Sequence, residues 1–431
     1  MTENIFQSNL SAVNLQSNVQ RPVNEDFIDV KVLMEKLTDQ DLIQSADDYW
    51  KRMNVYSEQS FKPFSNSSDV IYLTRHLSLL FQAADIKIGM RVLDFGCATG
   101  WLTRALSDMG LSAHGVDVSA RALDIANKVL SFRRPLDGNM PEFSIYNGIN
   151  LPYEDSSFAR ILCFDTFHHV RDQFGTLAEM KRVLKPGGKI AMLEPGVGHS
   201  LSEASQYEMK NFNVIENDTD MDAIAGFCRD LDLFEPRMLL QMNVPLDMSV
   251  LEHKSWTLGT IEGKALDQAT KEDIIRLAAP QFVGAQCFYI EKCLHTLNSK
   301  NIECTNGKIE LLGSYKLSQN ASIFEIVLAV TNTGSSTWMC DGFKGPGSVN
   351  IGVKLISQDG VILHENLARF SLLQKYVLPA ERLESRVVIS EYLRNIIGEN
   401  YLVFELVAEN IFWFGTKSSD SRVTWSPNLI T

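Results

Sequence analysis

The feature that most constrains the fold is a glycine turn at the end of an apolar run. Residues 92–100 read V-L-D-F-G-C-A-T-G, so Asp94 closes a predicted strand, and Gly96 and Gly100 follow it. Glycine lets the backbone turn tightly after a strand and come close to a ligand. A strand, a glycine turn and a helical pattern together are typical of a parallel α/β sheet, which binds ligands beyond the carboxyl ends of its strands.

After this turn, strand-like and helix-like segments alternate along the chain. A helical period over residues 72–83 precedes it, and the runs that follow predict the elements of a parallel sheet. The predicted strands are 91–95, 112–118, 143–146, 159–164, 189–193, 237–242 and 287–291, and the predicted helices between them are 100–109, 119–129 and 174–184. We therefore expect the α/β class, with a doubly wound, Rossmann-like sheet of seven strands.

The length of 431 residues exceeds one ordinary core and indicates two or three domains. Residues 1–45 are polar with weak periodicity, so we expect a loosely ordered lead-in with one short helix near 30–37. The α/β domain then spans 46–300, with a helical cap at its start and a substrate-side insertion at about 196–285. The insertion contains two predicted helices, 220–231 and 271–277.

The pattern of apolar and polar residues changes after a polar boundary near residue 300. Short alternating runs, separated by turn signals, follow at 323–331, 349–356, 383–389, 401–407 and 411–414. Several short strands at this spacing, without a long helix, are typical of a β-sandwich. We expect an immunoglobulin-like, all-β domain over 306–431.

The composition argues against several classes of protein. The net charge is −13, and residues 308–431 carry 12 acidic and 11 basic side chains, so nearly all of the excess lies before residue 308. An acidic region disfavours a nucleic-acid partner and docking on anionic lipid. No run of about 18 apolar residues predicts a membrane span, and no signal peptide is evident. The seven cysteines form no C-x-x-C pair, which favours reduced thiols and a cytoplasmic location.

The glycine turn does not suit a phosphate. It lacks the lysine of a Walker loop and the G-x-G-x-x-G spacing of a dinucleotide turn. Asp94 would repel a pyrophosphate and favour a cation. Asp117 ends the next predicted strand, where an acidic group can accept the hydroxyls of a ribose. A ligand with a ribose, a positive charge and no phosphate is S-adenosylmethionine (SAM).

Five motifs in order resemble those of the class I SAM-dependent methyltransferases. They are D-F-G-C-A-T-G at 94–100, G-V-D-V-S at 115–119, N-L-P-Y-E-D-S-S-F at 150–158, F-D-T-F-H-H-V at 164–170 and R-V-L-K-P-G-G-K at 182–189. The resemblance implies a methyltransferase with SAM as cofactor and S-adenosylhomocysteine (SAH) as product. The cofactor site that it implies contains Asp94, Gly96, Cys97, Gly100, Asp117, Val118, Asn147, Gly148, Ile149, Phe164 and Asp165.

The resemblance also implies roles for these residues. The glycine turn would cradle the methionine moiety, Asp117 would bind the ribose, and Phe164 and Asp165 would lie near the methyl group. Two positions depart from the family pattern. Ala98 stands where the family often has a third glycine, and Asn147 stands at the adenine position, where Asp is usual. The amide oxygen of Asn147 can still accept from the adenine amino group.

Four polar residues follow the fourth and fifth predicted strands, at the ligand edge of the sheet. They are His168, His169, Glu194 and His199. Methyl transfer mainly needs alignment, but a hydroxyl acceptor benefits from a base, and histidine is suited to this near neutral pH. His169 and His199 are rival candidates for the base, and each of the four could instead cap a helix or satisfy a turn. No set of His, Asp or Glu shows metal-ligand spacing, so we expect no metal site.

Two further segments have less specific patterns. Residues 62–64, K-P-F, could close over the cofactor or form a surface loop. Glu203 and Glu208 lie on a predicted helix, and we expect a solvated face for both.

The all-β segment carries a second resemblance. The runs V-T-N-T-G-S-S-T-W at 330–338, V-N-I-G-V-K-L at 349–355 and F-E-L-V-A-E-N-I-F-W-F at 404–414 are similar to a β-sandwich module. This module is appended to methyltransferases and glycosyltransferases of bacterial surface-polysaccharide clusters. Exposed aromatic residues such as Trp338 or Trp413 would stack on sugars, whereas buried ones would form the core, and the sequence leaves both readings open.

The resemblances lead to one main hypothesis and two alternatives. The main hypothesis is O-methylation of a sugar hydroxyl in a polysaccharide or nucleotide-sugar precursor. The first alternative is SAM-dependent transfer to a small natural product or an amine, as an N- or C-methyl or an aminocarboxypropyl group. The second is a SAM- or glycan-binding protein without turnover. The expected partner is a small-molecule or glycan acceptor, and a homodimer is compatible with the sequence.

Overall fold

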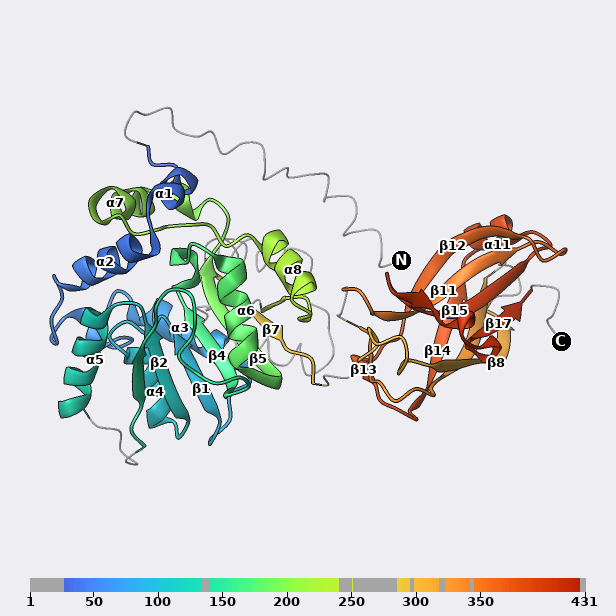
Figure 1. Cartoon of the computed structure of the whole chain (residues 1–431), viewed down its shortest axis with the longest axis horizontal. Coiled ribbons are helices and arrows are strands. Elements are labelled where there is room, and N and C mark those ends of the chain that lie inside the picture. Colours follow the sequence, from blue (N-terminus) through green and yellow to red (C-terminus); the bar gives the residue numbers. More distant parts are fainter. Residues whose placement is uncertain are drawn as a thin grey trace. The chain divides into compact units, whose positions relative to one another are not determined.

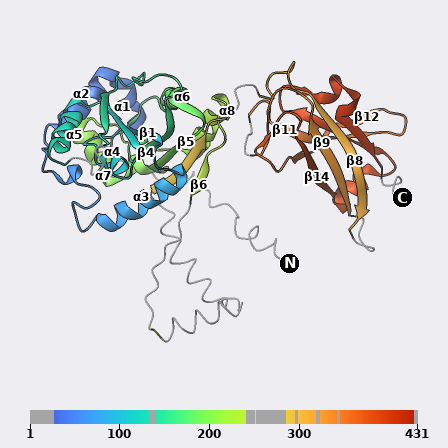
Figure 2. The same cartoon turned by 90° about the horizontal axis from the view of Figure 1, so that it is seen from below.

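The chain forms two compact units in the computed structural model, one mainly from residues before 290 and one mainly from residues after it. The structure describes residues 27–133, 139–239, 250, 285–294, 298–317, 323–341 and 345–426. The first unit combines a sheet with helices, and the second is built almost entirely of strands (Figures 1 and 2). Within the described residues, no helix is both long and apolar enough to cross a bilayer.

The first unit is organised by a seven-stranded sheet with the order β3-β2-β1-β4-β5-β7-β6. Its strands are β1 (Arg91–Phe95), β2 (Ser112–Asp117), β3 (Glu142–Ile145), β4 (Phe158–Phe164), β5 (Leu184–Pro195), β6 (Arg237–Leu239) and β7 (Ala285–Glu291). The pairs from β3 to β5 are parallel, and β6 runs antiparallel to β7. The chain order reverses between β1 and β4, which makes their carboxyl ends the switch point where such sheets bind ligands. The predicted doubly wound, Rossmann-like sheet is confirmed.

The helices that accompany the sheet were predicted from the sequence. They are α3 (Val70–Ala84), which precedes β1, and α4 (Trp101–Asp108), α5 (Ala120–Phe132) and α6 (Gln173–Val183); α8 (Met221–Asp230) begins in the first unit and continues into the second. One apolar cluster joins Leu80 of α3 and Leu102 of α4 to Val92 and Leu162 of the central strands. Burial of the central strands on both faces explains why their sequences are continuous apolar runs rather than alternating ones.

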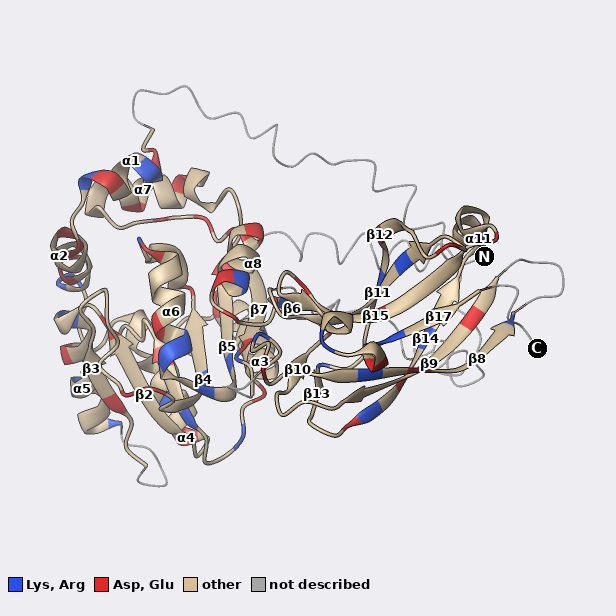
Figure 3. Cartoon of the chain, turned by 45° about the vertical axis from the view of Figure 1, so that its right-hand side comes forward, with Lys and Arg blue, Asp and Glu red and all other residues tan. Residues whose placement is uncertain are grey.

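A cap of three helices completes the first unit. It consists of α1 (Val30–Lys36), α2 (Asp39–Trp50) and α7 (Glu203–Phe212), which lie together in Figure 1. Val30, Met209 and Ile215 form the buried centre of this cap. Each cap helix carries Asp or Glu (red in Figure 3).

The structure differs from the sequence-based expectation at two places in this unit. Residues 39–45 belong to α2 rather than to a loosely ordered lead-in, because a capping box between Thr38 and Asp41 starts a regular helix. β5 begins at Leu184, whereas we predicted a stop over 185–188 and a strand only from 189. A register shift against β4 takes up the extra residues. Residues 1–26, 240–242 and 271–277 of the predicted segments lie outside the described residues.

The second unit is an all-β domain, as predicted. Its strands are β8 (Gly307–Lys316), β9 (Phe324–Asn332), β10 (Trp338–Met339), β11 (Val349–Ile356), β12 (Ile362–Ser371), β13 (Tyr376–Val377), β14 (Arg382–Ile389), β15 (Tyr401–Ala408), β16 (Phe412–Trp413) and β17 (Arg422–Trp425), with one short helix, α11 (Glu391–Ile397). One sheet has the order β12-β11-β15-β16, with β17 on β15, and another has the order β14-β9-β8. The prediction missed β8, β10, β12, β13 and β17. Of these strands, β12 is largely exposed and lacks the alternation of a half-buried strand.

The aromatic residues of the second unit are mainly its core. Trp338 and Phe414 are at most 1% exposed and pack edge to face. Trp413 is half-buried, with Lys354 Nζ 4.0 Å and the guanidinium of Arg369 4.6 Å from its ring centre. Of Trp338 and Trp413, the two aromatic residues that we had considered for sugar stacking, Trp338 is therefore structural.

Candidate active site

A cavity of about 820 Å³ lies in the first unit at the carboxyl ends of β1, β2 and β4. The turn after β1 contributes Gly96 and Ala98, the end of β2 contributes Asp117, and the end of β4 contributes Phe164 and Asp165. The cap helices α2 and α7 also line it. Its size falls within the range of about 300–1,000 Å³ that is typical of small-molecule sites. The cavity is therefore at the place that the sheet topology indicates.

The glycine turn needs its two glycines for different reasons. Gly96 has a φ of +71° and lines the cavity, and a Cβ there would lie 2.0 Å from Cγ2 of Thr166. Gly100 also has a φ of +71°, but a Cβ there would lie 2.5 Å from the ring of Phe143, away from the cavity lining. Cys97 is buried and is likewise outside the lining. Gly96 thus faces the cavity, whereas Gly100 and Cys97 shape the turn.

Asp117 presents a fixed carboxylate to the cavity. Its Oδ2 accepts from the backbone N–H of Ala98 at 2.8 Å, and its Oδ1 accepts from that of Ser119 at 2.9 Å. Burial raises the pKa of Asp117, and the backbone hydrogen bonds oppose this effect. A carboxylate has about four acceptor positions, so two remain for a diol. Val118, the next residue, also lines the cavity.

Asp94 lies behind the turn rather than in the cavity lining. Its Oδ2 accepts from the hydroxyl of Thr103 at 2.6 Å, and the side chain is 2% exposed. Burial raises the pKa of Asp94 to about 7. This geometry places Asp94 as a support for the turn, whereas we had expected it to contact the methionine moiety.

The far end of the cavity is formed after β3. Gly148 and Ile149 line it, and a Cβ on Gly148 would meet no protein atom within 4 Å. Asn147 lies outside this lining, and its Oδ1 accepts from the backbone N–H groups of Ile149 and Asn150 at 3.0 and 2.7 Å. These two bonds compete with the pairing to adenine that we had expected of Asn147. The backbone at Gly148 is therefore open to the cavity.

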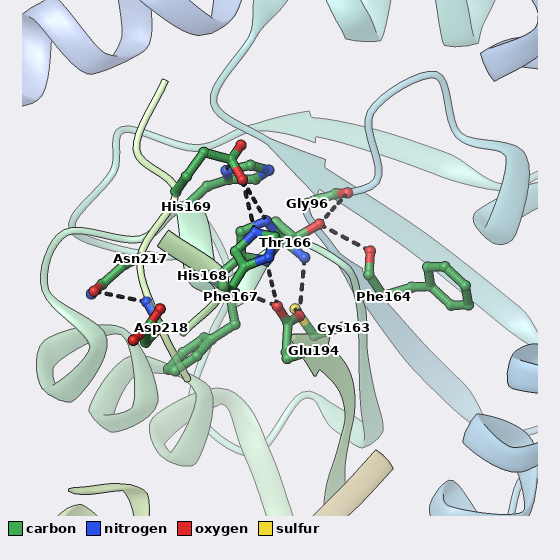
Figure 4. A network of polar contacts seen from close by, with 12 residues as sticks. Gly96, Cys163, Phe164, Thr166, Phe167, His168, His169, Glu194, Asn217 and Asp218 are labelled. Carbon is green, nitrogen blue, oxygen red and sulfur yellow. Dashed lines mark hydrogen bonds and ion pairs between the residues drawn. The ribbon is translucent and has the colours of Figure 1, made fainter. Parts of the chain in front are cut away.

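A cluster of histidines and carboxylates lies at the other end, where β4 and β5 stop (Figure 4). His168 and His169 lie on a 3-10 turn after β4, and Glu194 lies near the end of β5. The Nδ1–H of His168 donates to Oε2 of Glu194 at 2.8 Å. Oε1 of Glu194 accepts from the backbone N–H of Thr166 at 3.0 Å and from Sγ of Cys163 at 3.2 Å. Glu194 is therefore a buried anchor that orients His168.

Glu216 is the second carboxylate of the cluster, and it comes from the segment between α7 and α8. The Nε2–H of His199 donates to Oε2 of Glu216 at 2.8 Å. Glu216 Oε1 lies 3.5 Å from Nδ1 of His169, and Oε2 lies 3.9 Å from Nε2 of His168. The Nδ1–H of His169 donates to the backbone carbonyl of Ile215 at 2.6 Å. One carboxylate thus faces three imidazoles.

The protonation states of the cluster follow from these contacts. Burial lowers the pKa of His169, and the neighbouring His168 lowers it further. Burial opposes charge on His168, but the hydrogen bond to Glu194 and the negative charges of Glu194, Asp165 and Glu216 together outweigh it and raise the pKa of His168. Burial also disfavours charge on Glu194 and Glu216, yet the hydrogen bonds from His168 and His199 hold the pKa of each carboxyl below its usual value.

The structure brings most of the predicted site residues to one cavity. His168, His169, His199, Asp117, Val118, Gly96, Gly148, Ile149, Phe164 and Asp165 line it. Glu194 lies directly behind His168. Lys62 also lines the cavity, and burial lowers its pKa, whereas Phe64 of the same segment is 75% exposed.

Two functional candidates were not found by sequence reasoning. Glu216 lay in no motif, and Glu208, for which we expected a solvated face, lines the cavity instead. His168, His169 and Glu216 each place one ligand-type atom within 4.8 Å of the others. Our argument against a metal used sequence spacing, which cannot detect a third residue that folding brings in from another segment.

Comparison with known proteins identifies methyltransferases as relatives of the first unit. Residues 93–192 match the family described as "Methyltransferase domain". Methyltransferase GfsG from Streptomyces halstedii is 28% identical over 202 residues, which cover 44% of this chain and 70% of that protein. Demethylmenaquinone methyltransferase from Staphylococcus haemolyticus is 36% identical over 111 residues, which cover 25% of this chain and 45% of that protein.

Two further matches cover 35% and 60% of the relative. Phosphoethanolamine N-methyltransferase 2 from Caenorhabditis elegans is 28% identical over 154 residues, or 35% of each protein. The solved phosphoethanolamine N-methyltransferase 2 of Haemonchus contortus in complex with SAM is 19% identical, with a TM-score of 0.38 over 62% of this chain and 60% of that one. The chain thus spans well under two thirds of several of the proteins that it matches.

Proposed function

The chain carries a SAM-dependent methyltransferase domain, and we propose that this domain methylates a hydroxyl group with His169 as the proton acceptor. The observation that carries the proposal is the state of His169. Its Nδ1–H is held by the carbonyl of Ile215 at 2.6 Å, so the lone pair is on Nε2. Its lowered pKa keeps the ring neutral near pH 7. An oriented, neutral imidazole in the cavity is suited to take a proton from an alcohol.

The cavity fits SAM between its two ends. Asp117 would accept the ribose hydroxyls, Gly148 and Ile149 would contact the adenine, and Gly96 would allow the methionine moiety close to the backbone. SAM supplies an electrophilic methyl group on a sulfonium. Phe164 and Asp165, between the turn and the histidines, would place that methyl toward the acceptor end. Alignment of acceptor oxygen and methyl is the main contribution that the protein makes to this reaction.

The proposed acceptor is a sugar hydroxyl. Support comes from the resemblance of residues 330–414 to modules of polysaccharide enzymes, and from the base that an alcohol needs. The relatives act on varied acceptors by name, including demethylmenaquinone and phosphoethanolamine. A cytoplasmic location, a homodimer and the absence of a nucleic-acid partner stay predictions.

A second candidate is methylation of an amine. Among the described lining residues of the cavity, seven are carboxylates, whereas only Lys62 and Arg171 are cations. Arg171 is already paired with Asp39. An acidic cavity favours a cationic acceptor. An amine would not need His169 as strongly, since its neutral form already has a nucleophilic lone pair.

The test is an acceptor screen with SAM that carries an isotopically labelled methyl group. Sugars, nucleotide sugars, quinols and amino alcohols are incubated with the full chain, and products are identified by mass and by the position of the label. A labelled methyl ether whose formation is lost in His169→Gln supports the proposal. A labelled N-methyl product that survives this substitution establishes the amine alternative, and transfer of the aminocarboxypropyl group overturns both.

A further inference from the structure

We propose that His168, His169 and Glu216 form a binding site for a divalent transition-metal ion of the zinc type. Two histidines and one carboxylate are a donor set that holds Zn²⁺ in catalytic sites and leaves a position open for another ligand. Of the described residues, these three are the group whose ligand-type atoms lie within 4.8 Å of one another. Neither the sequence motifs nor the relatives assign a metal here.

The possible donor atoms already lie near one another. Glu216 Oε2 lies 3.9 Å from Nε2 of His168. Two ligands that both lie about 2.1 Å from one ion are about 3.0–3.4 Å apart, depending on the coordination angle, so binding would draw these two atoms together by about 0.5–0.9 Å. The rings of His168 and His169 have centres 3.9 Å apart, and Nε2 is the nitrogen of His169 that carries the lone pair, because its Nδ1–H is bonded to Ile215.

Each donor residue is held from behind by a hydrogen bond. Glu194 accepts from Nδ1 of His168, which leaves Nε2 of that ring for the ion. The carbonyl of Ile215 accepts from Nδ1 of His169, and His199 donates to Glu216. Metal-binding sites commonly have such partners on the far side of their ligands, because they fix the tautomer and the direction of each donor.

The charge of the surroundings also suits a cation. His168 and Glu216 are 3% and 7% exposed, and Glu194 behind them is 1% exposed. Buried carboxylates are unfavourable unless a positive charge compensates them. Within the described lining of the cavity, carboxylates outnumber Lys and Arg by seven to two, and Asp165 lies on the same side as the histidines. A divalent cation would balance this excess of negative charge. The histidines balance it without an ion only when they are protonated.

A bound ion would also help to activate the acceptor hydroxyl. This effect on the reaction rests on the proposed function, whereas the binding of the ion does not. An acceptor hydroxyl at the open coordination position would lose its proton more easily, since a bound divalent ion lowers the pKa of an oxygen ligand. The lone pair of His169 can serve the ion or the proton, but not both. Metal loading would therefore replace His169 as the group that activates the acceptor, and the proton of the acceptor hydroxyl would pass to solvent water.

The test measures metal binding on the full chain without turnover. The protein is stripped with a chelator, dialysed, and titrated with Zn²⁺ by calorimetry and with Co²⁺ by visible absorption. We expect one equivalent to bind with micromolar or tighter affinity, and the Co²⁺ bands to disappear on addition of Zn²⁺. Glu216→Gln and His168→Asn should each weaken binding at least tenfold. Glu203→Gln, which removes an exposed carboxylate of α7 outside the cavity lining, should leave it within twofold.

Binding of SAH to each variant shows that the fold is intact and separates the two proposals. Variants that bind SAH as the wild type does but lose the metal support the site. No saturable metal binding by a wild-type protein that binds SAH overturns it, and so does equal binding in Glu216→Gln. Failure of SAH to bind the wild type would instead count against the proposed function, whatever the metal does.

Discussion

The carboxylate of Glu194 lies 2.8 Å from Nδ1 of His168, and both side chains are almost fully buried. Glu194 comes from the end of β5, whereas His168 lies on the turn after β4. The same carboxylate accepts from the backbone N–H of Thr166 at 3.0 Å. This contact ties two strand ends together directly behind the cavity, so the stability of the fold and the shape of the site depend on one buried pair.

Glu194→Gln should destabilise the first unit by about 3 kcal/mol, the usual loss when one partner of a buried ion pair is removed. Urea unfolding followed by circular dichroism measures the shift of the earliest transition. Glu203→Gln is the matched control, because Glu203 is exposed on α7; we expect its effect to stay within about 0.5 kcal/mol. If both variants lose the same amount of stability, Glu194 does not stabilise the fold through its buried pair with His168.

The same pair predicts how stability depends on pH. The pKa of His168 is raised above 6.5, so its contribution is complete below that pH and is lost as the pH rises through the raised value. The pKa of Glu194 is lowered below 4.5, so its contribution is complete above that pH and is lost on acidification through the lowered value. Stability from the pair is therefore greatest between these limits. Urea midpoints from pH 4 to pH 9 should show the alkaline decline in the wild type and a weaker one in Glu194→Gln.

Asp117→Ala should weaken SAH binding at least tenfold, or about 1.4 kcal/mol, because the fixed carboxylate is lost from the ribose end of the cavity. Calorimetric titration of SAH into both proteins measures the change. Asp124→Ala on α5 is the control, since Asp124 pairs with Arg121 and Lys128 outside the cavity. Unchanged affinity in Asp117→Ala would mean that the cofactor does not lie against the end of β2.

Gly96→Ala should abolish SAH binding. It should also lower the free energy of unfolding by more than left-handed backbone strain alone would lower it. The new Cβ would lie 2.0 Å from Thr166 Cγ2, in addition to the strain at a φ of +71°. Gly360→Ala isolates the strain, because Gly360 has a φ of +84° and nothing within 4 Å. Left-handed strain costs about 1–2 kcal/mol, and overpacking adds about 1–3 kcal/mol. If thermal melts show the same loss of stability for both substitutions, the side chain of Thr166 moves aside for the new Cβ at no cost in stability.

Much of the first unit could be predicted from the sequence because its strands are buried on both faces. Val92 and Leu93 in β1, and Ile161 and Leu162 in β4, are all fully buried, and such runs are recognisable without knowledge of their neighbours. The residues that follow these runs then share one edge of the sheet, which is why His168 and Asp117 were found. The all-β second unit was predicted from five short apolar runs separated by turn signals.

Glu216 could not be predicted, because its position depends on contacts between distant segments. The neighbouring Ile215 is 1% exposed and packs with Val30 and Met209 in the centre of the cap. Burial of Ile215 holds this irregular segment over the sheet edge and turns Glu216 toward the histidines. The prediction that Glu208 lies on a solvated face was wrong for the same reason. Helical periodicity shows which face of a helix is polar, but it does not show what packs against that face.

The pH dependence of methyl transfer tests the state of His169 in the metal-free enzyme. The pKa of His169 is lowered below 6.5, so a reaction that needs its neutral form should be complete at pH 7 and fall on acidification, with a midpoint below pH 6.5. Single-turnover rates with labelled SAM, measured with a chelator present from pH 5 to pH 8.5, should show this acid limb. His169→Gln should lower the rate about 100-fold or more and remove the limb, while the affinity for SAH stays within twofold. His76→Gln is the control, because His76 lies on α3 outside the cavity lining and bonds the carbonyl of Tyr72. An acid limb that survives in His169→Gln would move the role of base to His199, whose Nε2–H is held by Glu216.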